Sequence, residues 1–406
     1  MKQYFALLFL VVIAACTTEK FDTKMQEDVT YLADDRLEGR QTGTEGEQIA
    51  ADYIAKRFRK LGLDPKGTEG YFQSFSFVPK THPHAQVKFT DSVSKNTITG
   101  KNVVGFLDNG AENTVIIGAH YDHLGWGSEG SLHRGDSLIH NGADDNASGV
   151  AVMLNVADRL QEINTNNNYL FMAFSGEEMG LLGSNYFAKN PTIDIKKVNY
   201  MINMDMVGRM KQDSSLAVYG TGTSPLLSQT VHSLGDDFKI IEKESGVGPS
   251  DHTSFYLQDL PVLHLFTGQH EDYHKPSDDA ELLNYEGMYK IADYVVAIVT
   301  ELDDNGKLKF TKTKNESEET PRFKVKLGVV PNYLYDGEGM KVDGVNEGGP
   351  AANAGIQKKD IVVKMGDLEI VDMMAYMKAL SQFERGQTVK VVVQRKKELV
   401  ETEVTF

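Results

Sequence analysis

Histidine and acidic side chains follow short apolar runs at two points between residues 114 and 178. The segment TVIIGAHYDHLG ends its apolar run with His120 and Asp122. The segment YLFMAFSGEEMG ends its run with Glu177 and Glu178. Runs of this kind form buried strands, and the carboxyl ends of parallel strands meet at one edge of a sheet, where α/β proteins bind ligands. Imidazole and carboxylate groups gathered there could hold metal ions and activate water for hydrolysis.

The spacing of these groups divides them into different roles. His120 and Asp122 are two residues apart, so their side chains point to the same side of an extended chain. One can then bind a metal while the other orients it, since a carboxylate commonly accepts the second ring N–H of a ligating histidine. Glu177 and Glu178 are adjacent and diverge, so one can hold a metal while the other faces substrate and water. His123 is expected to be a loop residue.

Further acids lie along the chain. Asp144 and Asp145 stand in NGADDNASG, before a predicted helix. They could cap that helix, but two acids among small residues also allow close approach to an ion, which favours a metal role for one of them. Asp205 lies inside the apolar run MINMDMV, where an unpaired carboxylate is costly. A metal or a salt bridge with Arg209 would satisfy it. His274, in the loop EDYHKPSD, is either a ligand or a surface histidine.

The motifs HYD, GADDNASG, FSGEE, NMDMVG and DYH, in this order and spacing, resemble the M28 family of zinc aminopeptidases over residues 25–303. Members of that family are α/β exopeptidases that use two zinc ions. The resemblance implies two Zn²⁺ per chain and, as substrates, peptides with free N-termini. The positions that match the family's zinc ligands are His120, Glu178, Asp205 and His274, with Asp145 as the bridging carboxylate. The matching catalytic positions are Glu177 as general base, Asp122 as partner of His120, and Tyr273 as hydrogen-bond donor to the tetrahedral intermediate.

Two other functions are compatible with these motifs. A glutaminyl cyclase would share the fold and several ligand positions but would use a single zinc ion. Tyr273 favours the peptidase, because comparable cyclases carry Trp at that position. A non-catalytic peptide-binding scaffold is the third possibility, and it is disfavoured because the ligands and the base are all present.

Helical and strand patterns alternate along this region, which indicates an α/β fold with a mostly parallel central sheet flanked by helices. Helices are expected at residues 25–32, 45–61, 149–160, 226–234 and 285–302. Strands are expected at residues 71–78, 102–107, 115–118, 169–174, 198–207, 216–219 and 260–266. The loop EGRQTGTEG, residues 38–46, also resembles the start of bacterial members of the family.

The first residues predict export. Residues 4–15 are almost wholly apolar but too short to span a bilayer, which is typical of a signal peptide. The run ends in IAAC and resembles a lipobox, in which Cys16, the single cysteine of the chain, would be lipidated. An ordinary signal peptide is the alternative. We expect a lipoprotein signal segment at 1–16, a tether at 17–24, and an exported protein anchored to a membrane in the periplasm or at the outer membrane.

The length of 406 residues predicts more than one domain. Residues 304–320 are charged and nearly free of apolar side chains, as in a linker. Residues 321–406, with KLGV and GGPAANAG, resemble a small β-rich PDZ domain, whose sheet edge accepts an extended peptide with a C-terminal carboxylate. Leu327, Gly328 and Val329 match the carboxylate-binding loop; a purely structural module is the alternative. The net charge of −16 argues against nucleic acid as a partner.

Overall fold

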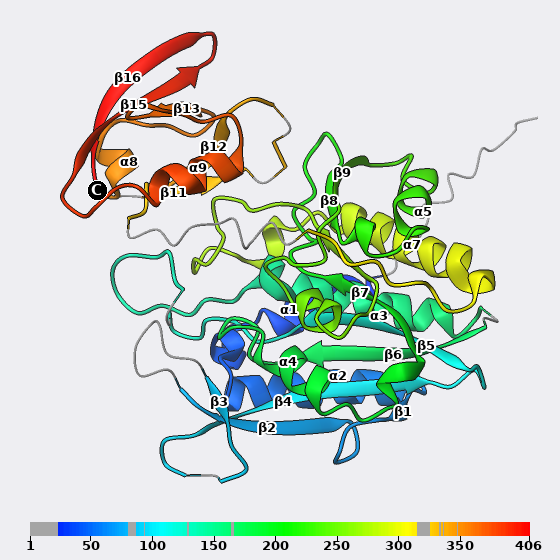
Figure 1. Ribbon diagram of the computed structural model, residues 1–406. Helices are drawn as coiled ribbons and strands as arrows, with labels where there is room; N and C mark the ends of the chain where they lie inside the picture. The colour runs from blue at the N-terminus through cyan, green and yellow to red at the C-terminus, as the bar shows by residue number, and fades with distance from the viewer. Residues whose placement is uncertain are drawn as a thin grey trace, which may run out of the picture.

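The computed structural model describes residues 23–79, 87–92, 94–127, 130–163, 166–314, 325–332, 334–335, 337–346 and 348–406. They form a larger domain and a C-terminal domain, drawn in orange and red in Figure 1. The expected signal segment 1–16, with Cys16, lies outside the described residues, as does most of the tether. No helix in the described part of the chain has the length and apolar character needed to cross a membrane.

A ten-stranded sheet forms the centre of the larger domain, in the order β3-β2-β4-β6-β5-β7-β10-β8-β9, with β1 on β4. Its parallel centre consists of β6 (Asn167–Phe174), β5 (Asn113–His120), β7 (Val198–Met204) and β10 (Val262–Phe266). The flanking strands are β1 (Asp64–Pro65), β2 (Phe72–Val78), β3 (Lys88–Phe89), β4 (Ile98–Leu107), β8 (Ser215–Tyr219) and β9 (Lys239–Lys243). Strands β4 and β8 join the centre in antiparallel orientation, and β9 pairs with β8 in parallel at the edge, so the sheet is mixed.

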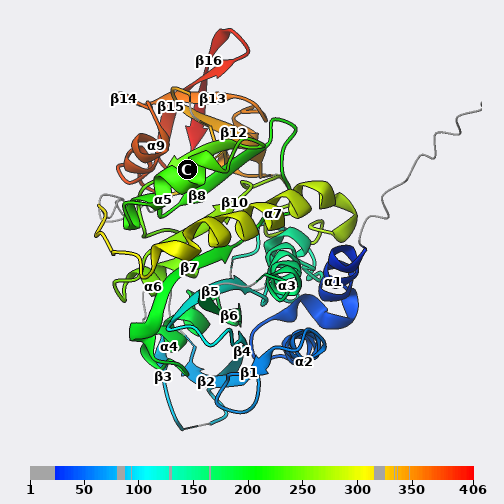
Figure 2. The ribbon, with the colours of Figure 1, turned by 90° about the vertical axis from the view of Figure 1, so that its right-hand side faces the viewer.

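Helices cover both faces of this sheet, as Figure 2 shows. One face carries α1 (Lys24–Leu32), α2 (Glu45–Lys60), α3 (Gly149–Leu160) and α7 (Tyr285–Leu302), and α5 (Leu227–Ser233) packs on α7. The other face carries α4 (Leu182–Lys189) and α6 (His252–Tyr256). Strand β6 explains the pattern: Tyr169 and Phe171 enter the core under α3, whereas Leu170 and Met172 enter the core under α4. A strand buried on both faces is apolar at successive positions, so the expected α/β class is confirmed.

Strand β7 is shorter than expected. The apolar run predicts a strand to residue 207, but β7 ends at Met204, and Met206 has a φ of +51°. Asp205 therefore lies just beyond the strand and not inside it. Met206 and Val207 are buried all the same, because the turn that contains them packs into the domain. Burial in a turn and burial in a strand produce the same apolar pattern.

The C-terminal domain has a six-stranded sheet of its own. Its strands are β11 (Val329–Pro331), β12 (Met340–Val345), β13 (Ile361–Met365), β14 (Leu368–Glu369), β15 (Thr388–Arg395) and β16 (Glu398–Thr405), and its helices are α8 (Pro350–Asn353) and α9 (Met373–Leu380). Leu327, Val342 and Val391 are among the fully buried residues of a separate core. The expected β-rich C-terminal domain is confirmed.

The first part of the expected linker lies on the larger domain. The Leu308 N–H donates to Asn199 Oδ1 at 2.7 Å, and the Thr311 N–H donates to the Thr223 carbonyl at 2.8 Å. The Thr313 N–H donates to the Tyr256 hydroxyl at 3.0 Å. This stretch has few apolar residues, and it is held by backbone hydrogen bonds that its composition does not reveal.

Helix α2 begins with a reciprocal hydrogen-bonded cap. Thr44 Oγ1 accepts from the Glu47 N–H at 3.4 Å, and Glu47 Oε2 accepts from the Gly43 N–H at 2.6 Å. Glu47 is 3 % exposed, and the hydroxyl of Ser175, at the end of β6, also donates to its carboxylate. This capping box joins the start of α2 to the strand end that leads to Glu177.

Glu47 predicts a pH dependence of stability. Burial raises its pKa from 4.5 to about 7. Its contribution to stability is therefore full below the unfolded pKa of 4.5 and is lost as the pH rises through about 7. Glu47→Gln cannot ionise at this position. When the pH rises from about 5 to about 8, the unfolding free energy of the wild type should therefore fall by on the order of 2 kcal/mol more than that of Glu47→Gln, measured by urea denaturation.

The matched control is Glu45→Gln, which changes an exposed acid on the same helical turn. It should follow the wild type at both pH values. Equal losses for Glu47→Gln and the wild type would show that Glu47 does not titrate on unfolding in this range.

Candidate metal centre

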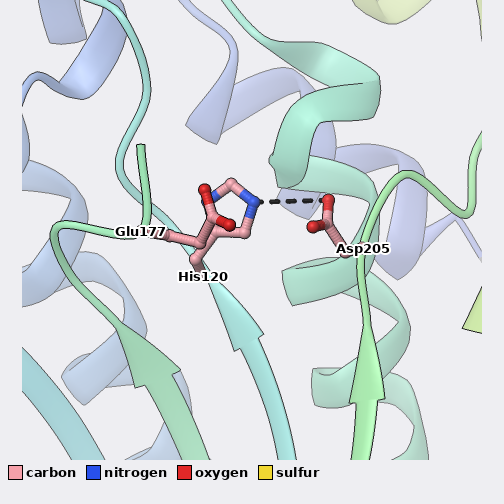
Figure 3. Close-up of side chains that lie close together, drawn as sticks. All are labelled: His120, Glu177 and Asp205. Atoms are coloured by element: carbon pink, nitrogen blue, oxygen red, sulfur yellow. Dashed lines mark hydrogen bonds and ion pairs between the residues drawn. The ribbon is translucent and has the colours of Figure 1, made fainter. Parts of the chain in front are cut away.

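The side chains singled out in the sequence converge at the carboxyl edge of the parallel centre. His120 is the last residue of β5, Asp205 follows β7, and Glu177 and Glu178 follow β6. Figure 3 shows His120, Glu177 and Asp205 pointing toward one another above the ends of their strands. The topology brings these residues together because β6, β5 and β7 are neighbours in the sheet.

The first group of donors surrounds His120. Its Nε2 lies 3.3 Å from Asp205 Oδ1 and 3.3 Å from Asp145 Oδ1. Its Nδ1 faces Asp122, 3.3 Å from the carbonyl oxygen and 3.7 Å from carboxylate Oδ1. Asp122 can therefore accept a hydrogen bond from the Nδ1–H group. In that tautomer the lone pair on Nε2 is directed at the carboxylates.

The second group surrounds His274. Its Nε2 lies 3.1 Å from Asp145 Oδ2 and 3.3 Å from Glu178 Oε2. Its Nδ1 is 2.9 Å from the Gly130 carbonyl, which accepts only a hydrogen bond, so the proton belongs on Nδ1 and the lone pair on Nε2. The two oxygens of Asp145 thus face histidines of two different groups. The ring of Tyr273 stacks on that of His274, with centroids 3.8 Å apart.

His123 is closer to the site than the sequence predicts. It lies in a loop as expected, but its side chain is buried, with Nδ1 2.7 Å from Glu178 Oε1 and 3.9 Å from Asp145 Oδ2. The signal for it was its position three residues after His120, in the loop that follows β5. A place in a loop does not by itself fix the direction of a side chain, so the contact could not be predicted.

Asp144 and Asp145 separate clearly. Asp145 faces the histidines, whereas Asp144 Oδ1 accepts from the Gly208 N–H at 2.6 Å and Asp144 Oδ2 lies 3.1 Å from His270 Nε2. The Asp278 carboxylate accepts from the N–H groups of both residues, at 3.0 and 3.1 Å, and so holds the backbone that presents Asp145. No side-chain cap is present at the start of α3, which removes the helix-capping alternative.

The alternative partner for Asp205 is also excluded. Arg209 Nη2 pairs with Asp272 at 3.0 Å. Asp205 lies instead against His120. The carboxylate at this position is therefore directed into the site.

Charge is concentrated in this site. Although burial opposes ionisation, hydrogen bonds from His120 and His274 hold the pKa of Asp145 well below its usual range. Desolvation, with the charges of Asp205 and Glu178, holds the pKa of Glu177 well above its usual range. A group of carboxylates this close together needs cations to balance its charge.

The donor set fits zinc. Possible ligand atoms of His120, Glu177 and Asp205 lie within 4.8 Å of one another, as do those of His123, Asp145 and Glu178. Imidazole nitrogen and carboxylate oxygen, without thiolate, suit zinc or a similar borderline metal. The second ring nitrogens of His120 and His274 each face a backbone carbonyl, as is usual for metal-binding histidines, whereas Nε2 of His123 is buried without a partner.

Arg40 is a structural residue of the site that the sequence did not reveal. It is 1 % exposed, and its guanidinium donates to the carbonyls of Tyr121, at 2.7 Å, Asn141, at 2.6 Å, Gly142, at 3.0 Å, and Leu32. Three of these carbonyls belong to the segments that follow His120 and precede Asp145, and the carbonyl of Leu32 ends α1. Burial lowers the pKa of Arg40 to about 10, which still leaves it charged at neutral pH.

Removing this guanidinium should destabilise the domain. Arg40→Met leaves buried carbonyls without a donor and removes a buried positive charge beside the acidic site, at a cost on the order of 3 kcal/mol. Arg40→Lys keeps the charge but cannot span the same acceptors, so we expect an intermediate loss. Urea denaturation of the zinc-loaded protein measures both. Arg36→Met, which removes an exposed arginine bonded to Asp34, is the control and should change little.

The three residues that match the carboxylate-binding loop of a PDZ domain differ from one another in their surroundings. Leu327 is fully buried in the domain core, and its carbonyl accepts from the Ala351 N–H at 2.9 Å. Gly328 has a φ of +79°, a conformation that suits glycine. Val329 begins β11, the edge strand of the described sheet. A loop before an edge strand is the geometry that peptide addition to a sheet requires.

Comparisons with known proteins agree with this fold. A zinc aminopeptidase from Bacillus subtilis matches with 18% identity and a TM-score of 0.54, over 72% of this chain and 96% of that one. A glutaminyl cyclase from Porphyromonas gingivalis matches with 18% identity and a TM-score of 0.54, over 68% of this chain and 97% of that one. These likenesses show that the larger domain has the same fold as these two enzymes.

The sequence comparisons identify two domains. Residues 102–299 match the model of peptidase family M28, and residues 309–406 match the PDZ domain. The chain thus carries a peptidase M28 domain followed by a PDZ domain. A protein named "Probable leucine aminopeptidase" from Trichophyton verrucosum is 30% identical over 257 residues, which are 59% of this chain and 65% of the relative's length. The expected domain boundaries at 25–303, 304–320 and 321–406 stay predictions.

Proposed function

We propose that this protein is a di-zinc aminopeptidase that removes N-terminal residues from peptides. The observation that carries the proposal is the position of Asp145, whose two oxygens face the Nε2 atoms of His120 and His274 at 3.3 and 3.1 Å. Two donor sets that share one carboxylate are suited to a pair of metal ions. The name of the Trichophyton relative agrees with this activity.

Each proposed zinc ion has its own set of ligands. His120, Asp145 and Asp205 would hold one ion, and Asp145, Glu178 and His274 would hold the other. When bound, a pair of zinc ions lowers the pKa of water and polarises a carbonyl group. His123, hydrogen-bonded to Glu178, is a positioning residue in this scheme because it fixes the orientation of that carboxylate.

Glu177 is the proposed general base. Its carboxylate lies beside His120 and Asp205, and its raised pKa suits a group that must accept a proton from water and return it to the leaving amine. Its N–H donates to Asp122 Oδ1 at 3.1 Å, so Asp122 fixes the positions of both Glu177 and His120. Tyr273, beside His274, is the proposed donor to the tetrahedral intermediate.

Glutaminyl cyclase activity is the second candidate, because the Porphyromonas gingivalis cyclase has the same fold. The geometry favours the peptidase, since His120 and Asp205 complete a second donor set that a single zinc ion would not need. A non-catalytic scaffold is disfavoured because the proposed ligands and base all converge in one place.

Replacement of Glu177 tests the mechanism. The zinc-loaded protein, given a mixed library of free and N-acetylated peptides, should shorten only the free ones, read by mass spectrometry. Glu177→Gln should lower that rate by at least about 100-fold, because it removes the proton acceptor while keeping its shape, and should leave the zinc content unchanged. Glu112→Gln, at an exposed position, is the control. Unchanged turnover would refute the role of Glu177, and loss of water or ammonia without cleavage would indicate a cyclase.

Metal content tests the number of ions. Elemental analysis of the purified protein after zinc loading and desalting should give two zinc ions per chain. Asp205→Asn should retain one, because it weakens only the set around His120, and Asp145→Asn should weaken both. One tightly bound ion in the wild type would contradict the di-zinc proposal.

Two further proposals rest mainly on the sequence. Export and anchoring to a membrane follow from the signal-like segment and Cys16. The PDZ domain would accept the C-terminal residues of a peptide as an added strand beside β11, with the loop at Leu327, Gly328 and Val329 holding the carboxylate.

A further inference from the structure

The C-terminal domain lies beside the metal centre. Figure 2 shows it beyond β8, at one end of the large sheet. Lys211 Nζ pairs with Asp343 Oδ2 at 2.8 Å, and Lys358 Nζ pairs with Glu271 Oε2 at 2.7 Å. Glu271 belongs to the loop that carries Tyr273 and His274. The PDZ domain therefore contacts the same loop that presents a proposed zinc ligand.

Leu334 enters the peptidase domain from the loop between β11 and β12. It is 5 % exposed and packs in a cluster with Met206, Ala217 and Phe266. The contact is close, since a Cβ at position 268 would lie 2.8 Å from Leu334 Cδ1, and Gly268 has a φ of +96° that favours glycine. An apolar side chain of one domain is thus buried against the other.

This apolar cluster borders the metal centre. Met206 follows Asp205 directly, and Tyr273, which packs against the cluster, stacks on His274. The cluster therefore joins Met206 and Tyr273, which neighbour two proposed zinc ligands, to Leu334 of the C-terminal domain.

Polar contacts fix the position of Leu334. Its N–H donates to Asn332 Oδ1 at 2.9 Å, and Asn332 Nδ2 donates to Asp343 Oδ1 at 3.0 Å. The other oxygen of Asp343 binds Lys211 of the peptidase domain at 2.8 Å. A lysine of one domain thereby holds the turn that presents Leu334.

We propose that Leu334 forms a wall of the pocket for the N-terminal side chain of the substrate and restricts its size. The inference rests on the proposed aminopeptidase function. With the first carbonyl group of a peptide at the metal centre, the first side chain starts next to the ligands. Met206, Phe266 and Tyr273 offer it an apolar surface, and Leu334 closes that surface from the PDZ domain. Small first residues are then preferred over aromatic ones.

The test is a change in selectivity. For the full-length zinc-loaded protein, kcat/KM is measured on alanine, leucine and phenylalanine p-nitroanilides. Leu334→Ala should raise the phenylalanine-to-alanine ratio roughly tenfold, the range that a few methylene groups produce in an apolar pocket. Leu399→Ala, at a 69 % exposed position of β16, should keep the wild-type ratio.

A second control separates the pocket wall from domain docking. Lys358→Ala removes an ion pair between the domains but leaves the apolar cluster intact. If it changes the ratio as much as Leu334→Ala does, the effect belongs to docking and the proposal is wrong. An equal loss on all three substrates, or an unchanged ratio, in Leu334→Ala would also overturn it.

A binding measurement keeps this test independent of turnover. Lack of activity on every substrate would refute the proposed function alone. Calorimetric titration of the zinc-loaded protein with free phenylalanine and free alanine would then test Leu334, because Leu334→Ala should tighten phenylalanine relative to alanine about tenfold. Unchanged relative affinities would overturn the role of Leu334.

Discussion

Several carboxylates share one small buried volume at the end of the sheet, and much of the peptidase domain serves to hold them there. Asp145, Asp205 and Glu178 each approach a histidine nitrogen within about 3.3 Å. Such a site is unfavourable unless cations balance it, so its shape must be maintained by groups other than the carboxylates themselves. The structure does this through the backbone: Asp278 binds the N–H groups of residues 144 and 145, and Asp122 binds the N–H of Glu177. The backbone around these carboxylates therefore fixes their orientation.

The residues that converge in this site were easier to find in the sequence than the residues that support them. The proposed ligands were recognisable because they follow apolar strands and match a family pattern in order. Arg40 was not recognisable, because a charged residue between glycine and glutamine in a polar loop usually faces solvent. It is buried because four carbonyls from three segments need a donor, and those segments meet only in the folded chain. Leu334, in the loop between β11 and β12, is a similar case, since it shares an apolar cluster with Met206 of the other domain and leaves no periodic pattern.

The periodicity of the sequence predicted helices and strands correctly where the apolar residues of a segment are buried for a single reason. The double-sided burial of β6 and the apolar stripe of α7 gave clear patterns, and both elements are present. The end of β7 was misplaced because Met206 and Val207 continue the apolar run for a different reason, as parts of a buried turn. Antiparallel flanks on a parallel centre depend on which strands pair, and pairing depends on contacts between distant segments.

The hydrogen bonds of Leu308, Thr311 and Thr313 keep the chain on the peptidase surface almost to the PDZ domain. Where a short tether begins at a fixed point, the tethered domain stays at a high effective concentration beside its docking surface. Individually weak, salt-screened pairs such as Lys358 with Glu271 are then sufficient for contact, because most of the entropic cost of association has been met by the connection. Docking of the two domains should accordingly tolerate the loss of single contacts and depend much more on the attachment of the chain at Thr311 and Thr313.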